Sequence, residues 1–263
     1  MHGIPVLMYH HVNPAGNALN VVPERFERQM GYLASAGYRT IDTSDLLDIL
    51  STGRKPPGRA VMITFDDGWL DNYLYAFPIL KEFNLKAVVF VVTSWAGERG
   101  VRTDKIPLPR HKDCVRLVQE DRSGDVVLSW DELREMESSG LIDVQSHTHS
   151  HIRWDREVPE DERIEALRED LEISRSMIEE KLNKPCNALC WPWGKGNVSY
   201  VKTAQEVGFR MLFTTEKGTN KGVEDLKGIK RIVIGNIKVP NLKKKLFIYS
   251  RPGFSRFYLR IFG

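Results

Sequence analysis

The amino-acid sequence predicts an α/β fold, a deformed (β/α) barrel of about seven to eight strands. Short apolar runs rich in β-branched residues alternate with segments of helical spacing, which is typical of parallel strands joined by helices. The chain has 263 residues, of which 41% are hydrophobic, and this is enough for one large domain with a substantial core. About seven or eight runs qualify as strands, and this number favours a barrel over an open doubly wound sheet.

The first half of the chain alternates between strand and helix patterns. An apolar run at residues 5–9 predicts a strand, and helical spacing then extends from Pro23 to Ala36 and stops at Gly37. Four further elements are predicted in order: a helix at 46–50, a strand at 61–65, a helix at 70–83 and a buried strand at 86–92. Residues 96–127 are charged and longer than an ordinary connection, so we expect them to cross the active rim.

The second half begins with a helix start signal. Ser129 and Glu132 have the spacing of a capping box, which predicts a helix that extends to Ser139 and ends at Gly140. The remaining predicted elements are a strand at 141–145, a long helix at 159–182 with a core-facing apolar stripe, a strand at 187–190, a helix through 209, and strands at 211–213 and 229–234. We assign residues 1–240 to one catalytic domain and residues 241–263 to a basic, aromatic C-terminal tail.

Charge, cysteine content and hydropathy limit the classes of protein to which the chain can belong. The formal net charge is only +3, so the overall electric field gives no reason to expect a nucleic-acid partner. The three cysteines form no Cys-x-x-Cys pair, which argues against a disulfide framework and favours a reducing compartment. The N-terminus shows no secretory leader and no window approaches about 20 uninterrupted apolar residues, so we expect a cytoplasmic location.

Candidate metal ligands follow two of the predicted strands. Asp66 and Asp67 come directly after the run at 61–65, while His147 and His151 come after the run at 141–145. Two histidines and one carboxylate can hold a divalent metal and leave positions open for water and substrate, with Asp67 as the obvious third ligand. Asp66 would then remain free as a general base for that water.

Each of these patterns also has a structural explanation. An isolated Asp-Asp-Gly is usually a turn, and a histidine-rich stretch is often solvent-facing. Their occurrence together, at the carboxyl ends of two predicted buried strands, favours the metal site. His149 lies between the two ligand candidates, and alternation favours a structural or supporting role for it.

These motifs carry a family resemblance. The Thr-Phe-Asp-Asp-Gly at residues 64–68 and the His-Thr-His-Ser-His at residues 147–151 resemble the first two motifs of polysaccharide deacetylases of the NodB homology type, carbohydrate esterase family four. The resemblance implies that Asp66 is the catalytic base and that Asp67, His147 and His151 bind the metal. Zn²⁺ is the expected ion, and the same ligands would also accept Co²⁺ or Ni²⁺.

The third motif of the family departs from its pattern here. Cys190 stands where the family has an arginine that orients the base, and Arg231 on a late strand is one candidate to replace it. The backbone N–H of Trp193 would serve as an oxyanion donor, a role that does not depend on the side chain. The motif residues Trp191, Pro192 and Gly194 are substrate-binding candidates, although loop tryptophans can equally roof the core.

The family's general acid is a histidine near the C-terminus, but the chain has no histidine after His151. Some relatives of the exopolysaccharide-modifying type are circularly permuted and place this histidine at the first strand, in a Tyr-His sequence. The sequence Tyr-His-His at residues 9–11 is similar, so we expect His10 to be the acid, with His11 as second choice. The structural alternative for His10 is a hydrogen-bonded histidine at a strand end.

The resemblance implies a metal-dependent hydrolase that removes an N-acyl group, most often N-acetyl, from an amino sugar. The substrate would be a cell-envelope polysaccharide or a lipid-linked saccharide. A degenerate barrel that binds saccharide without catalysis remains open, because the motif-three arginine and the C-terminal histidine are missing. An esterase acting on O-acyl groups is also open, since the same groups attack esters.

The tail at residues 241–263 interleaves lysine and arginine with aromatic side chains. This composition favours contact with an anionic membrane surface, here the inner membrane face. Residues 252 and 253 are Pro and Gly, which interrupt any single helix. The alternative is a tail that packs across the barrel with its lysines in solvent.

Overall fold

The computed structural model describes residues 3–15, 19–56, 58–98 and 100–262, and its central feature is a curled parallel sheet. The strand order is β10-β1-β5-β6-β7-β8-β9, and β4 pairs with β5 beside this path. The strands are β1 (Val6–Tyr9), β4 (Tyr38–Thr40), β5 (Arg59–Phe65), β6 (Ala87–Val91), β7 (Ile142–Ser146), β8 (Ala188–Cys190), β9 (Met211–Phe213) and β10 (Ile232–Val233). A separate short pair joins β2 (His11–Val12) to β3 (Asn20–Val21).

The segment that leads into β10 connects the two ends of this sheet. Ile229 forms a parallel bridge with Phe213 of β9, and its N–H donates to the Leu212 carbonyl over 2.7 Å. At the far end of the same segment, the Ile234 N–H donates to the Met8 carbonyl of β1 over 2.9 Å. The sheet therefore curls into the deformed barrel that the sequence predicts.

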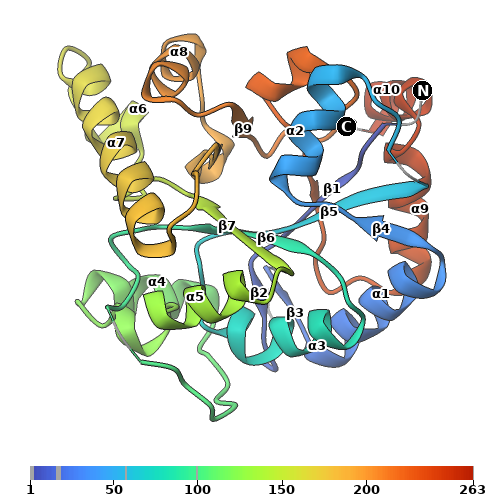
Figure 1. The fold of residues 1–263 in the computed structure, drawn as a ribbon, viewed down its shortest axis with the longest axis horizontal. Coiled ribbons are helices and arrows are strands. Elements are labelled where there is room, and N and C mark those ends of the chain that lie inside the picture. The colour runs from blue at the N-terminus through green and yellow to red at the C-terminus, as the bar shows by residue number, and fades with distance from the viewer. Residues whose placement is uncertain (1–2, 16–18, 57, 99, 263) are drawn as a thin grey trace.

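Helices surround the sheet (Figure 1). They are α1 (Pro23–Ser35), α2 (Thr43–Thr52), α3 (Phe77–Glu82), α4 (His111–Gln119), α5 (Trp130–Ser138), α6 (Trp154–Glu157), α7 (Arg163–Leu182), α8 (Val198–Val207), α9 (Val239–Tyr249) and α10 (Pro252–Phe262). In Figure 1, α7 and α8 lie on one side of the sheet, and α1 and α9 lie on the other. No helix within the described ranges is both long enough and apolar enough to cross a bilayer.

Most of the predicted elements are present, and the differences include the following. The predicted helix at 70–83 is divided between a π-helical turn (Asn72–Ala76) and α3. The long helix begins only at Arg163, and Ile164 of its predicted core-facing stripe is 36% exposed. The sequence did not predict β4, because its three residues include the exposed Arg39 and form no apolar run.

Alternation along the strands separates two apolar layers. Inward-facing side chains such as Met62 and Val88 pack with residues of α2, whereas their neighbours Ile63 and Val89 pack beneath the outer helices. The inward direction continues beyond the end of β5. Asp66 therefore faces the inside of the barrel, at the carboxyl end where α/β barrels place their chemistry.

Residues 241–262 form most of α9 and all of α10. Leu242 and Leu246 of α9 are buried in the main core. On α10, by contrast, Phe254 and Phe257 are exposed. The first of these two helices is thus packed as part of the fold, and the second covers it.

Candidate active site

Three of the predicted metal ligands meet at the carboxyl ends of β5 and β7. Asp67 Oδ1 lies 3.3 Å from His147 Nε2 and 3.5 Å from His151 Nε2. The backbone at Asp67 and His151 has positive φ angles of 74° and 52°, which non-glycine residues seldom adopt. The chain thus bends sharply at both residues, and these bends direct the side chains to one point.

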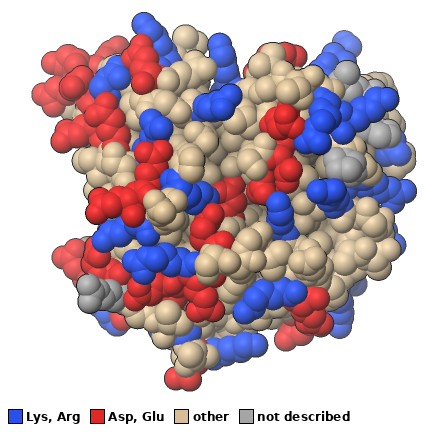
Figure 2. Space-filling view, viewed as in Figure 1, with Lys and Arg blue, Asp and Glu red and all other residues tan. Residues whose placement is uncertain are grey.

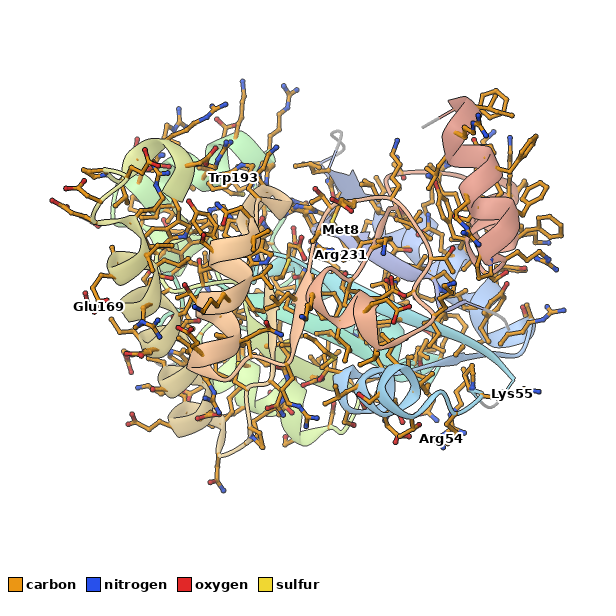
Figure 3. All side chains as sticks on the ribbon, turned by 90° about the horizontal axis from the view of Figure 1, so that it is seen from above. Met8, Arg54, Lys55, Glu169, Trp193 and Arg231 are labelled. Carbon is orange, nitrogen blue, oxygen red and sulfur yellow. The ribbon has the colours of Figure 1, made fainter. Side chains whose placement is uncertain are left out.

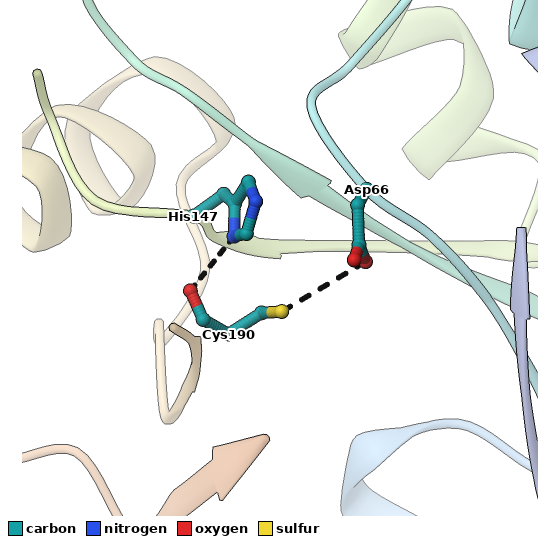
Figure 4. Close-up of side chains that lie close together, drawn as sticks. All are labelled: Asp66, His147 and Cys190. Carbon is teal, nitrogen blue, oxygen red and sulfur yellow. Dashed lines mark hydrogen bonds between the residues drawn. The ribbon is translucent and has the colours of Figure 1, made fainter. Parts of the chain in front are cut away.

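The arrangement fits a divalent metal. Ligand atoms bound at about 2.0–2.1 Å in a tetrahedron lie roughly 3.4 Å apart, which agrees with both distances. The Nδ1–H of His147 donates to the Cys190 carbonyl over 2.7 Å, so its Nε2 lone pair is free for a metal (Figure 4). Trp69 Nε1–H donates to the second oxygen of Asp67 over 2.8 Å and fixes that carboxylate.

Electrostatics keep Asp67 ionised. Burial alone would raise the pKa of this carboxyl, but the adjacent imidazoles of His147 and His151 outweigh burial and hold the pKa well below its ordinary value. Asp67 is therefore a carboxylate, the form that binds metal.

Asp66 does not join this group and is held by a buried guanidinium. Arg231 binds both carboxylate oxygens of Asp66, with Nη1 at 2.6 Å from Oδ1 and Nη2 at 2.8 Å from Oδ2. Burial would raise the pKa of Asp66, yet the charge and hydrogen bonds of Arg231 lower it below its ordinary value. Figure 3 shows Arg231 in the middle of the barrel, near Met8 of β1. The structure thus places Arg231 where it can orient the predicted base.

Cys190 lies beside this ion pair. Its Sγ is 3.0 Å from Arg231 Nη2 and 3.8 Å from Asp66 Oδ1 (Figure 4). Asp66, His147 and Cys190 also lie close enough together to suggest a second metal site. Because Asp66 is already paired with Arg231, these three residues are not a free ligand set.

The two neighbouring histidines of the first strand face different surroundings. His10 Nε2 lies 4.0 Å from Asp66 Oδ2, and the His10 side chain is 17% exposed. His11 is buried, with Nδ1 bonded to Asp71 Oδ2 over 2.7 Å and Nε2 bonded to His111 Nδ1 over 3.1 Å. Both ring nitrogens of His11 are therefore engaged, and His10 is the histidine that shares a pocket with Asp66.

The motif-three loop has one exposed ring. Trp193 is 46% exposed, and its ring centre lies 4.5 Å from that of His151. Trp191 is only 1% exposed and Pro192 is also buried, so neither side chain can contact a sugar as predicted. The Trp191 side chain instead covers the core, and the backbone N–H of Trp191 donates to the Phe213 carbonyl. Gly194 has a φ of 67° and packs against Thr215, so it shapes the loop and offers no side-chain contact.

Sequence reasoning missed three aromatic residues of this pocket. Trp95 packs against His151, Trp69 stacks on His11, and His111 lies edge-on to Trp69 with ring centres 5.6 Å apart. His111 belongs to the segment at 96–127 that was predicted to cross the rim. A lone histidine in a charged segment carries no pattern that could have singled it out. His149 bonds to Thr93 through Nδ1, in agreement with a supporting role.

Comparison with known proteins gives consistent results. YxkH of Bacillus subtilis (strain 168) is 27% identical over 229 residues, which are 87% of this chain and 70% of YxkH. The poly-beta-1,6-N-acetyl-D-glucosamine N-deacetylase of Escherichia coli (strain K12) is 24% identical over 271 residues, 92% of this chain but 38% of that protein.

Among solved structures, the deacetylase PplD of Streptococcus pyogenes superposes with a TM-score of 0.76 at 24% identity, covering 93% of this chain and 98% of PplD. IcaB from Ammonifex degensii superposes with a TM-score of 0.75 at 24% identity, covering 94% and 97%. These likenesses confirm the fold. The profile of the family described as polysaccharide deacetylase matches residues 53–212, more than half of the sequence, and the chain therefore belongs to the polysaccharide deacetylase family.

Proposed function

We propose that the protein removes the acetyl group from N-acetylglucosamine units of a β-1,6-linked polysaccharide or of its lipid-linked precursor. The observation that carries the proposal is the pair of neighbouring carboxylates with separate partners, Asp67 with two histidines and Asp66 with Arg231. Relatives from Escherichia coli and Staphylococcus epidermidis are named as deacetylases of poly-beta-1,6-N-acetyl-D-glucosamine, which supports the choice of sugar.

Asp67, His147 and His151 would hold the metal, with Zn²⁺ as the expected ion. When bound, this ion supplies acidification of a water molecule and polarisation of the amide carbonyl. Asp66 is ionised and takes a proton from the water. The N–H of Trp193 has no hydrogen-bond partner among the described residues, so it is free to donate to the developing oxyanion.

His10 completes the proton transfers. Burial lowers its pKa, and although Asp67 and Asp66 oppose this effect, the net shift is downward, so the imidazole starts neutral. The proton that Asp66 takes from water can pass to His10, whose Nε2 lies 4.0 Å from the carboxylate. His10 then protonates the departing nitrogen.

An acetate-release assay tests this function. We expect the zinc-loaded protein to release acetate from a β-1,6-linked N-acetylglucosamine oligosaccharide, to lose this activity with a chelator, and to regain it with Zn²⁺. The O-acetyl version of the same sugar separates amidase from esterase activity. If no N-acylated saccharide, lipid-linked ones included, yields acetate or formate, the protein is a saccharide-binding barrel.

We further propose that α10 contacts an anionic membrane. Its exposed apolar side chains Phe254, Phe257 and Ile261 alternate with exposed Arg256 and Arg260. Figure 2 shows that Lys and Arg gather on the side of the molecule where α9 and α10 lie. Near an anionic leaflet each such cation contributes about 1 kcal/mol. This surface would suit a lipid-linked substrate.

We also propose a cytoplasmic location, and the three free cysteines are in keeping with it.

Vesicle sedimentation tests the membrane contact. Replacing Phe254, Phe257 and Ile261 with serine is expected to reduce binding to phosphatidylglycerol-containing vesicles at least about tenfold, because the helix loses its apolar insertion. A matched control replaces Val198 and Val223, exposed elsewhere, with serine and should bind like the unmodified protein. Equal sedimentation of all three proteins would contradict the proposal.

A further inference from the structure

A chain of three hydrogen-bonded side chains leads from the protein interior to the pocket. Asp71 Oδ2 bonds to His11 Nδ1 over 2.7 Å, and His11 Nε2 bonds to His111 Nδ1 over 3.1 Å. Asp71 and His11 are buried, whereas His111, the first residue of α4, is half-buried. None of the three binds the metal in the arrangement described above.

The hydrogen bonds of this chain hold the His111 ring in place. Asp71 Oδ2 shares one hydrogen bond with His11 Nδ1, and His11 Nε2 shares the next with His111 Nδ1. Nε2 is therefore the ring nitrogen of His111 that lies outside the chain of bonds. Burial lowers the pKa of His111 to about 4, so its imidazole is neutral near pH 7.

The outer edge of His111 borders the catalytic pocket. Its ring lies edge-on to His10, with ring centres 6.1 Å apart, and edge-on to Trp69, which holds the ligand Asp67. Within the part of the chain that the structure describes, Nε2 of His111 has no hydrogen-bond partner. A buried aspartate and a buried histidine therefore orient a ring nitrogen for which no described residue is a partner.

We infer that His111 positions the substrate through a hydrogen bond between its Nε2 and a ring hydroxyl of the amino sugar that carries the scissile amide. This inference rests on the proposed function, since an amino sugar at the site is its premise. A sugar hydroxyl suits the site because it is neutral and can both donate and accept a hydrogen bond. His111 would thus favour hydroxylated rings over other acylated amines, because its Nε2 stays unpaired when the hydroxyl is absent.

Binding measurements in an inactive background test the inference apart from turnover. In protein carrying Asp66→Asn, calorimetry would give Kd for a β-1,6-linked N-acetylglucosamine oligosaccharide and for its 3-deoxy and 4-deoxy analogues. His111→Asn keeps an amide group that can bond to His11 but removes the outer ring nitrogen. Lys112→Ala, an exposed neighbour on α4, is the matched control.

We expect His111→Asn to weaken binding of the intact oligosaccharide about tenfold, as loss of one hydrogen bond predicts. One deoxy analogue should bind equally to proteins with and without this substitution, because its missing hydroxyl is the partner of His111 Nε2. Metal content and unfolding temperature should be unchanged. An unchanged Kd, or the same weakening for all three saccharides, would overturn the inference. Failure of the unmodified protein to release acetate would instead refute the proposed function, and the binding result would stand.

Discussion

Replacing Asp66 with asparagine is expected to reduce acetate release by a factor of about 10² to 10⁴ while the protein keeps its metal. The amide is similar in shape to the carboxylate but cannot take a proton from water. Asp67, His147 and His151 are untouched by the change, and their mutual distances do not depend on Asp66. Turnover of the oligosaccharide and metal content of the purified protein are the two measurements.

His147→Ala is the matched comparison for this prediction. It removes one of three ligands, so both metal and turnover should be lost. Circular dichroism should show that both variants are folded. An Asp66→Asn protein that lost its metal would mean that Asp66 is itself a ligand, and the separation of roles between the two carboxylates would be wrong.

Arg231→Met is expected to destabilise the protein by about 3–5 kcal/mol, because it leaves the Asp66 carboxylate buried without its partner. It should also move the acid limb of the pH–activity profile to higher pH. In the unmodified protein Arg231 lowers the pKa of Asp66, so the base stays ionised until the pH falls through that lowered value. Without Arg231, burial raises the pKa, and activity is lost at a higher pH as the solution is acidified.

A second substitution in this background provides the control. Cys190 Sγ lies 3.8 Å from Asp66, so an arginine at position 190 could approach the same carboxylate from β8. The double variant Arg231→Met with Cys190→Arg should therefore recover part of the lost stability and return the acid limb toward lower pH. Denaturant unfolding and kcat/KM against pH measure both effects. If the acid limb of Arg231→Met stays at the same pH, the Arg231 guanidinium does not lower the pKa of Asp66.

The metal pocket could be predicted because its residues are concentrated at strand ends. Asp66 and Asp67 follow a run that is apolar except for Thr64, and His147 follows a run in which apolar and polar residues alternate. Parallel strands bring their carboxyl ends to one rim, so two local patterns were enough to predict that residues far apart in the sequence lie close together. The capping box at Ser129 is predictable for the same reason, since all of its partners lie within one helical turn.

The remaining features depend on contacts between distant residues, for which the neighbouring sequence carries no pattern. Whether Trp191 or Trp193 faces solvent is decided by a left-handed bend at Trp193, and bulky residues rarely adopt this conformation. His111 reaches the pocket because the segment at 96–127 folds over the rim, and its composition does not specify that path. The family motif has its arginine at position 190, and Arg231, the replacement candidate named from the sequence, is the residue that binds Asp66.

The partnership between Asp66 and Arg231 spans a separation of 165 residues, and Arg231 lies on the segment that completes the barrel. Asp66 acquires its countercharge only after residues 229–234 have inserted between β9 and β1. During synthesis the metal ligands leave the ribosome before residues 229–234 do, so a chain that ends before Arg231 would carry every metal ligand but lack the countercharge of the base.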